Sequence, residues 1–211
     1  MATASQSLFN MTVASDNAGG NQGLLMPKLQ YRFRVNFLNF GVGQTIELTK
    51  QVVDITRPQV SFGEISIPVY NSTLYLAGRH EWQALTVNIR DDAQGQVSKL
   101  VGQQLQKQLD FVEQASAATG QDYKFQTNIE ILDGGNGTAA PQVLETWEVY
   151  GCFLQQANYN NLAYSANEPV TIALTIRFDN AVQSPLSAGV GTNIGRVLGG
   201  STVTGIGSGQ G

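Results

Sequence analysis

The side chains that could do chemistry in this chain are few and widely spaced. His80 is the only histidine, which excludes a metal site built from several histidines and leaves one candidate base. Its neighbours Arg79 and Glu81 indicate a solvated position where a strand begins. Asp91 and Asp92 form a pair of carboxylates, as in an acid–base site, but directly before a helical pattern such a pair is more typical of helix capping.

The sulfur and glycine motifs are equally uninformative about catalysis. Cys152 is the single cysteine, so an internal disulfide and a metal site of several cysteines are both excluded. Free cysteines usually behave as small buried hydrophobic side chains, and we interpret Cys152 in that way. The glycine clusters at residues 134–137 and 199–211 lack the strand-to-helix context and the lysine of a phosphate-binding loop. The sequence therefore predicts that the protein is not an enzyme and that it holds no cofactor or metal.

Composition points towards a subunit of an assembly. The chain has 211 residues, of which 42% are hydrophobic, enough for a sizeable core, and 13% are charged, about half the usual fraction. A weakly charged surface fits a subunit covered by its neighbours, although a weakly charged monomer stays possible. The net charge of −4 argues against a phosphate-binding surface. It is compatible with the wall of a channel along which DNA slides.

Three segments differ in composition. Residues 1–26 are small, polar and Gly-rich, which predicts a flexible N-terminal arm. Residues 27–180 carry the strand and helix patterns of one domain. Residues 181–211 are again Gly-rich, with Arg196 as their only charge, and we expect a flexible C-terminal extension. The chain has no secretory signal and no membrane-spanning apolar run, so we expect a soluble protein made in a cytoplasm.

Alternation of apolar and polar residues predicts most of the secondary structure. A mixed pattern at 45–55 indicates a further strand with a bulge near Lys50. One apolar stripe predicts a helix over 94–117, closed by Gly120 as a left-handed cap. The expected fold is mainly β, an antiparallel β-sandwich or half-open barrel of about six to seven strands with one flanking α-helix and flexible termini. The clearest strand patterns lie at residues 29–37, 82–90, 123–131, 143–154 and 170–178.

Residues 60–78 have the pattern of a long hairpin that leaves the domain. A short apolar arm around Ile65 and Ile67 leads to a turn at Asn71-Ser72, and the returning arm breaks at Gly78. A polar turn with two short apolar arms is not stable alone in water. The hairpin therefore needs a partner to lie on.

The order of motifs around this hairpin resembles a known family. Ile67-Pro68-Val69, a turn, Ala77-Gly78-Arg79, Trp82, an alternating strand, an acidic stop and an amphipathic helix follow one another. This order is similar to that of the tail tube proteins of T-even-type contractile bacteriophages. That family belongs to one superfamily with the inner tube proteins of type VI secretion and injection devices. The resemblance covers residues 27–113, with a weaker echo at 148–179, and no single motif in it is diagnostic.

The resemblance implies a structural role. Family members form hexameric rings in which each sheet joins its neighbours' sheets, and the rings stack into a hollow tube. The polar faces of the strands would line the lumen, and the helix would lie outside, near the sheath, with Gln103, Gln106, Lys107 and Asp110 on its outer face. The hairpin at residues 61–78 would reach the adjacent ring. Its expected interface residues are Ser61, Ile65, Ile67, Pro68, Val69, Tyr70, Asn71, Ser72, Leu74, Leu76 and Gly78.

The resemblance also implies partners and a location. These are further copies of the chain, a tail sheath protein, a tape-measure protein, and baseplate and tail terminator proteins, with no membrane. The genome would pass through the lumen without specific contacts. The tube would belong to the tail of a virion assembled in the host cytoplasm. The Gly-rich extension departs from the family, whose typical members end soon after the last strand.

Two alternatives stay open. Within the same class, the chain could be a baseplate protein that starts the tube, or the tube of an injection device. In another class, it could be a monomeric β-sandwich binding module, for example for carbohydrate or a capsid surface. Such modules usually expose aromatic side chains in loops, where only Tyr159 and Tyr164 are of interest, whereas Trp82 and Trp147 occupy strand positions.

Overall fold

The structure is a computed structural model that describes residues 28–43, 45–133, 141–185, 189–191, 196–198 and 201–203. The chain divides into two compact units, Met1–Arg32 and Phe33–Gly211. In the first unit the Arg32 amide donates a hydrogen bond to the Leu29 carbonyl at 3.2 Å, and the Arg32 guanidinium lies 5.5 Å from the centre of the Tyr31 ring. This turn replaces the first part of the strand predicted at 29–37, and the strand itself begins at Phe33.

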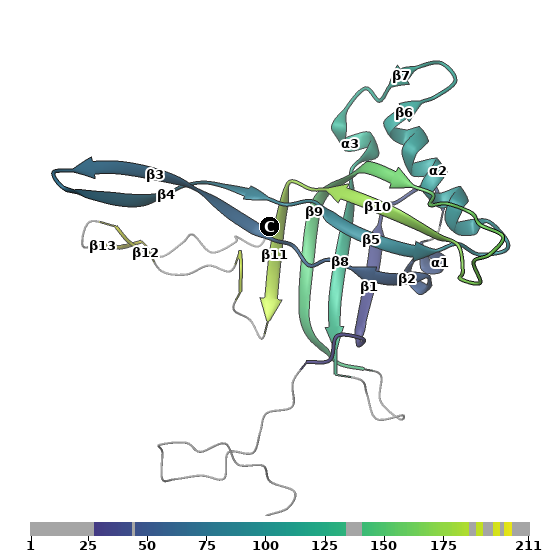
Figure 1. Cartoon of the computed structure of the whole chain (residues 1–211), viewed down its shortest axis with the longest axis horizontal. Coiled ribbons are helices and arrows are strands. Elements are labelled where there is room, and N and C mark those ends of the chain that lie inside the picture. The colour runs from purple at the N-terminus through teal and green to yellow at the C-terminus, as the bar shows by residue number, and fades with distance from the viewer. Residues whose placement is uncertain are drawn as a thin grey trace, which may run out of the picture. The chain divides into compact units, whose positions relative to one another are not determined.

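The second unit is built on an antiparallel sheet of seven strands, which confirms the predicted mainly β fold (Figure 1). The strands follow the path β1-β8-β9-β10-β5-β2, and β11 pairs with β9 beside this path. The path has two ends and does not close into a barrel. The strands are β1 (Phe33–Leu38), β2 (Val52–Ile55), β5 (Leu85–Arg90), β8 (Phe125–Leu132), β9 (Val143–Asn158), β10 (Thr171–Arg177) and β11 (Asn180–Pro185).

Strand β9 runs through both halves of this sheet. Its first part pairs with β8 and β11, and its last part pairs with β10. The bend lies at Gly151, which has a φ of +68° and has no room for a side chain, because a Cβ there would be 2.2 Å from Oδ2 of Asp179. Asp179 in turn accepts a hydrogen bond from Lys124 at 2.5 Å. Glycine and an irregular register are the usual devices where a strand changes sheets.

The core lies between the two halves of the sheet. On β5 and β10 the apolar residues form cross-strand pairs, such as Val87 with Leu174. Phe40 packs edge-on against Phe125, with ring centres 4.9 Å apart. The alternating patterns of the sequence thus mark the buried faces correctly, at Val35, Phe37, Leu85, Ile89, Ile129, Val149, Ile172 and Ile176.

Helix α2 (Gln96–Gln108) covers part of this core with Val97, Leu100 and Val101. The acidic pair precedes its start: Oδ1 of Asp92 accepts a hydrogen bond from the Val97 amide at 3.0 Å, but the N-cap position itself is occupied by Gly95, which makes no side-chain cap. Gln104 is fully buried on the same helix. Its Oε1 accepts from the Gly41 amide at 2.9 Å, and its Nε2 donates to the Tyr123 carbonyl at 2.6 Å.

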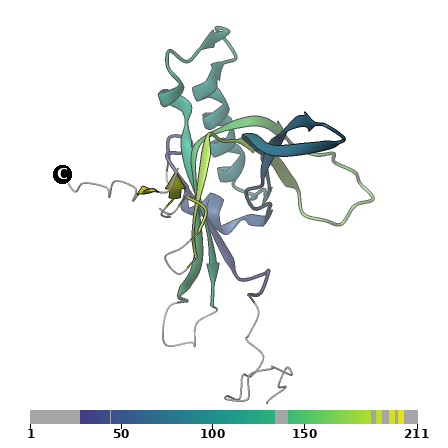
Figure 2. The ribbon, with the colours of Figure 1, turned by 90° about the vertical axis from the view of Figure 1, so that its left-hand side faces the viewer.

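The predicted helix over 94–117 is too long. The chain leaves the helix after Gln108 and forms a small hairpin of β6 (Leu109–Asp110) and β7 (Ala115–Ser116), which stands beyond the end of α2 (Figures 1 and 2). Oδ1 of Asp110 accepts hydrogen bonds from the amides of Val112 at 2.8 Å and Glu113 at 3.3 Å. An aspartate that binds the backbone in this way favours a turn over a helix.

Other predictions also need correction. Gly120 begins helix α3 (Gly120–Tyr123), whose capping box is made by Thr119 and Asp122, so Gly120 is not a left-handed cap. In the region predicted as a strand at 45–55, the first part is helix α1 (Ile46–Lys50), and only β2 is extended. Burial explains this helix, because its turn places Leu48 fully in the core.

The last part of the chain contributes to the sheet. Strand β11 pairs with β9 along its whole length, so the sheet includes residues that the sequence analysis assigned to the flexible extension. Strands β12 (Arg196–Leu198) and β13 (Ser201–Val203) form a further pair. The predicted arm at 1–26 lies outside the described part of the chain, and so does the rest of the extension apart from residues 189–191. Within the described part, no helix is long and apolar enough to span a membrane.

Candidate assembly interface

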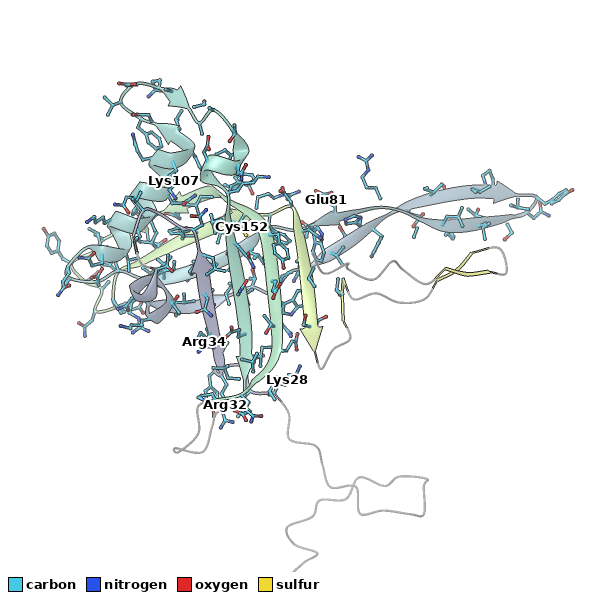
Figure 3. The ribbon with its side chains drawn as sticks, turned by 180° about the vertical axis from the view of Figure 1, so that it is seen from behind. Lys28, Arg32, Arg34, Glu81, Lys107 and Cys152 are labelled. Atoms are coloured by element: carbon cyan, nitrogen blue, oxygen red, sulfur yellow. The ribbon has the colours of Figure 1, made fainter. Side chains whose placement is uncertain are left out.

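The hairpin of β3 (Val60–Val69) and β4 (Ser72–Trp82) confirms the hairpin predicted at residues 60–78, but β4 does not break at Gly78: it continues to Trp82, and the strand predicted at 82–90 begins only at Leu85. It projects from the sheet as a two-stranded ribbon that pairs with no other strand of the described residues (Figures 1 and 3). Every residue of β3 is exposed, and on β4 only Gly78 and Trp82 are not. An isolated two-stranded hairpin is at best marginally stable in water. Within the part of the chain that the structure describes, no second layer of residues covers the ribbon.

The far part of the ribbon has one apolar and one mixed face. Ile65 is paired with Leu76, and Ile67 with Leu74, so these four side chains share one face together with that of Val69. The opposite face carries polar and smaller side chains together with Tyr75. We call the first group the apolar hairpin face: Ile65, Ile67, Val69, Leu74 and Leu76, all of them exposed.

Two glycines separate this face from the root of the hairpin. The register shifts between Phe62 and Glu64, where Gly63 and Gly78 face each other. A Cβ on Gly78 would lie 3.1 Å from the Gly63 carbonyl oxygen, so a side chain there would push the two closely spaced backbones slightly apart. Below this bulge, Trp82 fixes the root by packing against Phe178, with ring centres 5.6 Å apart.

The tip of the hairpin is a turn at Tyr70-Asn71, one residue earlier than predicted. Tyr70 has a φ of +49°, in the left-handed region that glycine and asparagine tolerate best. A bulky residue there costs about 1–2 kcal/mol. The turn holds the Tyr70 side chain fully exposed at the end of the ribbon. From Ile65 to Gly78 the ribbon has no charged residue.

The polar positions predicted on the outer side of the helix are largely engaged within the subunit. Oε1 of Gln103 accepts from the Val42 amide at 3.2 Å, and Nζ of Lys107 donates to the Asn39 carbonyl at 3.4 Å. Gln106 is exposed, as predicted. Asp110 is not on the helix at all but in β6, and the hydrogen bonds from the backbone amides of its turn, chiefly that of Val112, lower the pKa of its carboxyl group.

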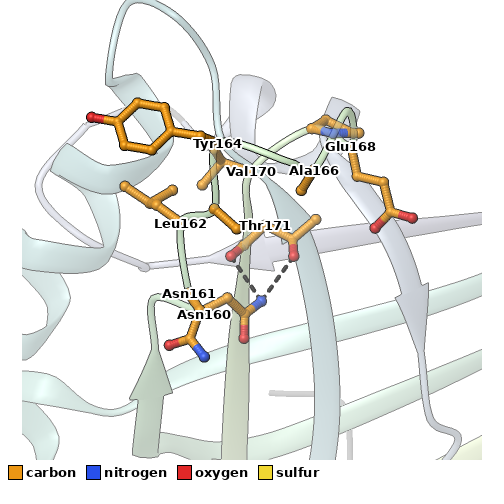
Figure 4. A pocket seen from close by; sticks show the side chains of 10 residues that line it. Asn160, Asn161, Leu162, Tyr164, Ala166, Glu168, Val170 and Thr171 are labelled. Atoms are coloured by element: carbon orange, nitrogen blue, oxygen red, sulfur yellow. Dashed lines mark hydrogen bonds between the residues drawn. The ribbon is translucent and has the colours of Figure 1, made fainter.

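A second surface feature lies in the loop between β9 and β10. Residues 160–171 surround a hollow of about 550 Å³ (Figure 4). Asn160 shapes it, because its side-chain amide donates to the Thr171 carbonyl at 3.0 Å and to the Thr171 hydroxyl at 2.8 Å. Leu162 and Tyr164 lie on one side of the hollow and Glu168 on the other. Both Leu162 and Tyr164 are exposed.

His80 and Cys152, the other residues considered for chemistry in the sequence, lie in different surroundings. His80 is exposed on the hairpin and contacts the rings of Phe62 and Trp82. Cys152 is buried, and burial raises the pKa of its thiol from the ordinary 9.0 to about 11. Among the described residues, no group of three or more histidine, cysteine and acidic side chains could hold a metal ion.

Sequence reasoning missed several exposed side chains. Phe62 and Tyr75 belong to the hairpin surface, but Tyr75 lies between Leu74 and Leu76, so no alternation of apolar and polar residues marked it. Phe111 and Val112 are exposed at the turn of the β6–β7 hairpin. There the helical spacing of Val112 was misleading. The hollow had no signal, because it depends on how β9 and β10 meet.

Comparison with known proteins finds solved structures with a similar fold but no relative by sequence. No family model matches the chain, and no curated protein matches it. Chains of three solved assemblies are similar in structure. The first belongs to the anti-feeding prophage cap, described as a tube terminating cap, with a TM-score of 0.53 and 14% identity over 77% of this chain and 94% of that chain. The second belongs to the anti-feeding prophage baseplate, with a TM-score of 0.52 and 14% identity over 78% of this chain and 100% of that chain. The third belongs to the PVC sheath-tube complex of an extracellular contractile injection system, with a TM-score of 0.51 and 13% identity over 77% of this chain and 95% of that chain.

The likeness extends over nearly the whole length of those chains, at an identity too low to show more than the fold. It fits the open seven-stranded sheet and the flanking helix described above. The resemblance drawn from the order of motifs in the sequence is therefore confirmed at the level of architecture. This chain has the tail-tube-type fold found in contractile injection systems.

Proposed function

We propose that the chain is a structural subunit of the inner tube of a contractile tail, and that it forms hexameric rings that stack into a hollow conduit. The observation that carries this proposal is the projecting hairpin with its uncovered apolar face. Exposed apolar patches of this kind mark sites of protein association. On a tail-tube-type fold, the surface available to cover the ribbon is that of another copy.

The sheet supports the formation of a ring. Strands β1 and β2 end the strand path, and among the described strands none pairs with their outer edges. Open edges are a hazard in a monomer, but they become joints when a neighbouring subunit adds its own strand. A heterologous contact of this type gives a ring when the rotation between subunits closes.

The polar face of β1 and β8, which points away from the core of the subunit, is suited to line the lumen of the tube. Nε of Arg34 donates to Oε2 of Glu130 at 2.7 Å, and the side-chain amide of Asn36 donates to Oε1 of the same carboxylate at 3.4 Å. The charges on this face are paired, so it offers no uncompensated cations to phosphates. We infer that a genome could slide along it without specific contacts.

The partners follow from the same proposal. The tube would contact a tail sheath outside and a tape-measure protein inside, and it would meet baseplate and terminator proteins at its ends. The protein would be structural rather than enzymatic and would belong to the tail of a phage virion assembled in the host cytoplasm. A baseplate initiator and the tube of an injection device are the alternatives within this class.

A shortened hairpin tests the proposal. Replacing residues 65–76 with Asn-Gly joins Glu64 to Ala77, which are already paired, through a favoured two-residue turn. We expect a folded subunit that forms no tubes, as judged by circular dichroism and electron microscopy. Val112→Ser, which changes an exposed apolar side chain outside the hairpin, is the control and should assemble normally. Normal assembly of the shortened variant would show that the hairpin does not stack the rings.

The binding-module alternative keeps one supporting observation, the hollow beside Tyr164. Both tryptophans are buried, so neither offers the exposed ring that such a site would use. A ligand in the hollow would therefore contact Tyr164 and the surrounding amides. Saturable binding of an oligosaccharide to a subunit that stays monomeric at all concentrations would favour this function.

A further inference from the structure

The hollow and the hairpin tip lie at opposite ends of the same strands. The hairpin ends just before Leu85, which pairs with Ile176, whereas the loop around the hollow ends just before Thr171, which pairs with Arg90. Along the antiparallel pair of β5 and β10, these are the two opposite ends. Figure 1 shows the ribbon leaving one end and the loop at the other. Seen along this direction, in Figure 2, the hairpin and the loop lie on the same side of the molecule.

This arrangement is what a head-to-tail contact needs. A copy displaced along the direction of β5 and β10 brings its hairpin towards the loop of the copy ahead of it. The contact uses two different surfaces of the chain, so it repeats without limit when the copies are stacked. Each subunit offers one tip and one hollow.

The two surfaces also match in chemistry. Residues 65–78 of the hairpin and residues 155–167 of the loop contain no charged residue, and Glu168 is the one charged side chain that lines the hollow, on the side opposite Leu162 and Tyr164. The rim of the hollow is apolar at Leu162, which is 80% exposed, and at Tyr164. Backbone and side-chain amides supply hydrogen-bonding groups for the Tyr70 hydroxyl and for Asn71. A volume of about 550 Å³ is ample for one aromatic side chain.

The turn itself supports a role for Tyr70 in recognition. Asparagine or glycine would be the favourable residue at a φ of +49°, yet the position carries a fully exposed tyrosine. Such strain is kept where a side chain must be presented in a fixed direction. A strained, exposed aromatic at the end of a projecting ribbon is a suitable anchor for a pocket on a partner.

We propose that the Tyr70-Asn71 tip of one copy seats in the hollow of residues 160–171 on the next copy, and that this contact sets the spacing between stacked copies. The inference rests on the proposed tube function and adds the acceptor surface to it. The apolar hairpin face lies along the neighbouring subunit, and the tip locks the end of the ribbon. Leu162 and Tyr164 close over the Tyr70 ring.

Site-directed crosslinking tests this contact in the assembled protein. The variants Tyr70→Cys/Leu162→Cys and Tyr70→Cys/Tyr164→Cys carry one cysteine at the tip and one at the rim. Under mild oxidation, or with a short bismaleimide, we expect a ladder of covalent multimers on a denaturing gel. Wild type controls for the buried Cys152, and Tyr70→Cys/Val112→Cys controls for exposed cysteines that are not neighbours. Neither control should give a ladder.

The outcomes separate this inference from the proposed function. Tubes in the electron microscope with no ladder from either rim position would overturn the acceptor site and leave the tube function intact. Subunits that stay monomeric at every concentration would contradict both. As a second measurement, Tyr70→Ser and Leu162→Ser should each raise the concentration needed for assembly about tenfold, and the double variant little further, because the two side chains share one contact. Additive effects of the two substitutions would also contradict the inference.

Discussion

The apolar hairpin face allows a quantitative prediction. Ile67 and Leu74 form one cross-strand pair and remain 40% and 52% exposed in the free subunit. Complete burial of such a side chain is worth about 1.5–3 kcal/mol, so covering the remaining half of both stabilises a contact by about 1.5–3 kcal/mol. The double variant Ile67→Ser/Leu74→Ser should lose this amount. Since about 1.4 kcal/mol is a factor of ten, assembly should require an about ten- to hundredfold higher concentration.

Analytical ultracentrifugation over a concentration series measures this shift directly. Folding of the free subunit should change little, because the ribbon packs on no core residue beyond its root. Tyr75→Ser is the matched control, since Tyr75 is a large side chain on the same ribbon, 63% exposed, but on the opposite face. Equal effects of the control and the double variant would refute the assignment of one apolar contact face. Unchanged assembly of the double variant would refute the contact itself.

Three further predictions concern the stability of the subunit. Gly151→Ala forces a side chain into the left-handed region and against Asp179, so urea denaturation should show a loss of at least about 1–2 kcal/mol, part of which Asp179→Ala restores. Gln104→Leu leaves the buried Gly41 amide and the partly buried Tyr123 carbonyl without their partner, and the same assay should show a loss of about 1–3 kcal/mol for the amide and a smaller loss for the carbonyl. The raised pKa of Cys152 contributes stability fully below pH 9.0, and this contribution is lost as the pH rises through about 11. Wild type should therefore lose up to about 3 kcal/mol more than Cys152→Ala over this range.

Most of the sheet could be predicted because its strands bury one face. In β10, Ile172, Leu174 and Ile176 alternate regularly with residues that are only partly buried, and all three side chains are in the core. The hairpin could be predicted because, unlike these strands, it buries neither face within the subunit. Its apolar arms are short and bounded by Gly78 and a polar turn, which indicates a ribbon that cannot fold back onto a core.

The errors occurred where local pattern and tertiary structure disagree. Leu109 and Val112 continue the spacing of helix α2, but the side chain of Asp110 binds the backbone and turns the chain. Helix α1 is only 5 residues long, too short for a periodic signal, and it is stabilised by the burial of Leu48. These contacts cannot be predicted from the composition of a short stretch of sequence.

The candidate interface was predicted only in part, because some of its features depend on contacts between segments that are distant in sequence. The sequence locates the hairpin and its apolar arms, because they are contiguous along the chain. The polar residues Gln103 and Lys107 were taken for a free outer surface, but each bonds to the loop at 39–42, which lies far away in sequence. The hollow depends on the extension of β9 to Asn158 and on its pairing with β10, so only the structure reveals it.

Electron microscopy of the purified, unmodified protein over a range of concentrations tests the tube function most directly. We expect rings with a central hole at intermediate concentration and, above it, hollow rods with a regular axial repeat. Addition of a baseplate-type ring would provide a nucleus if the first contact is slow. Compact particles of a single subunit's mass at every concentration, with or without such a nucleus, would show that the chain does not form a tube.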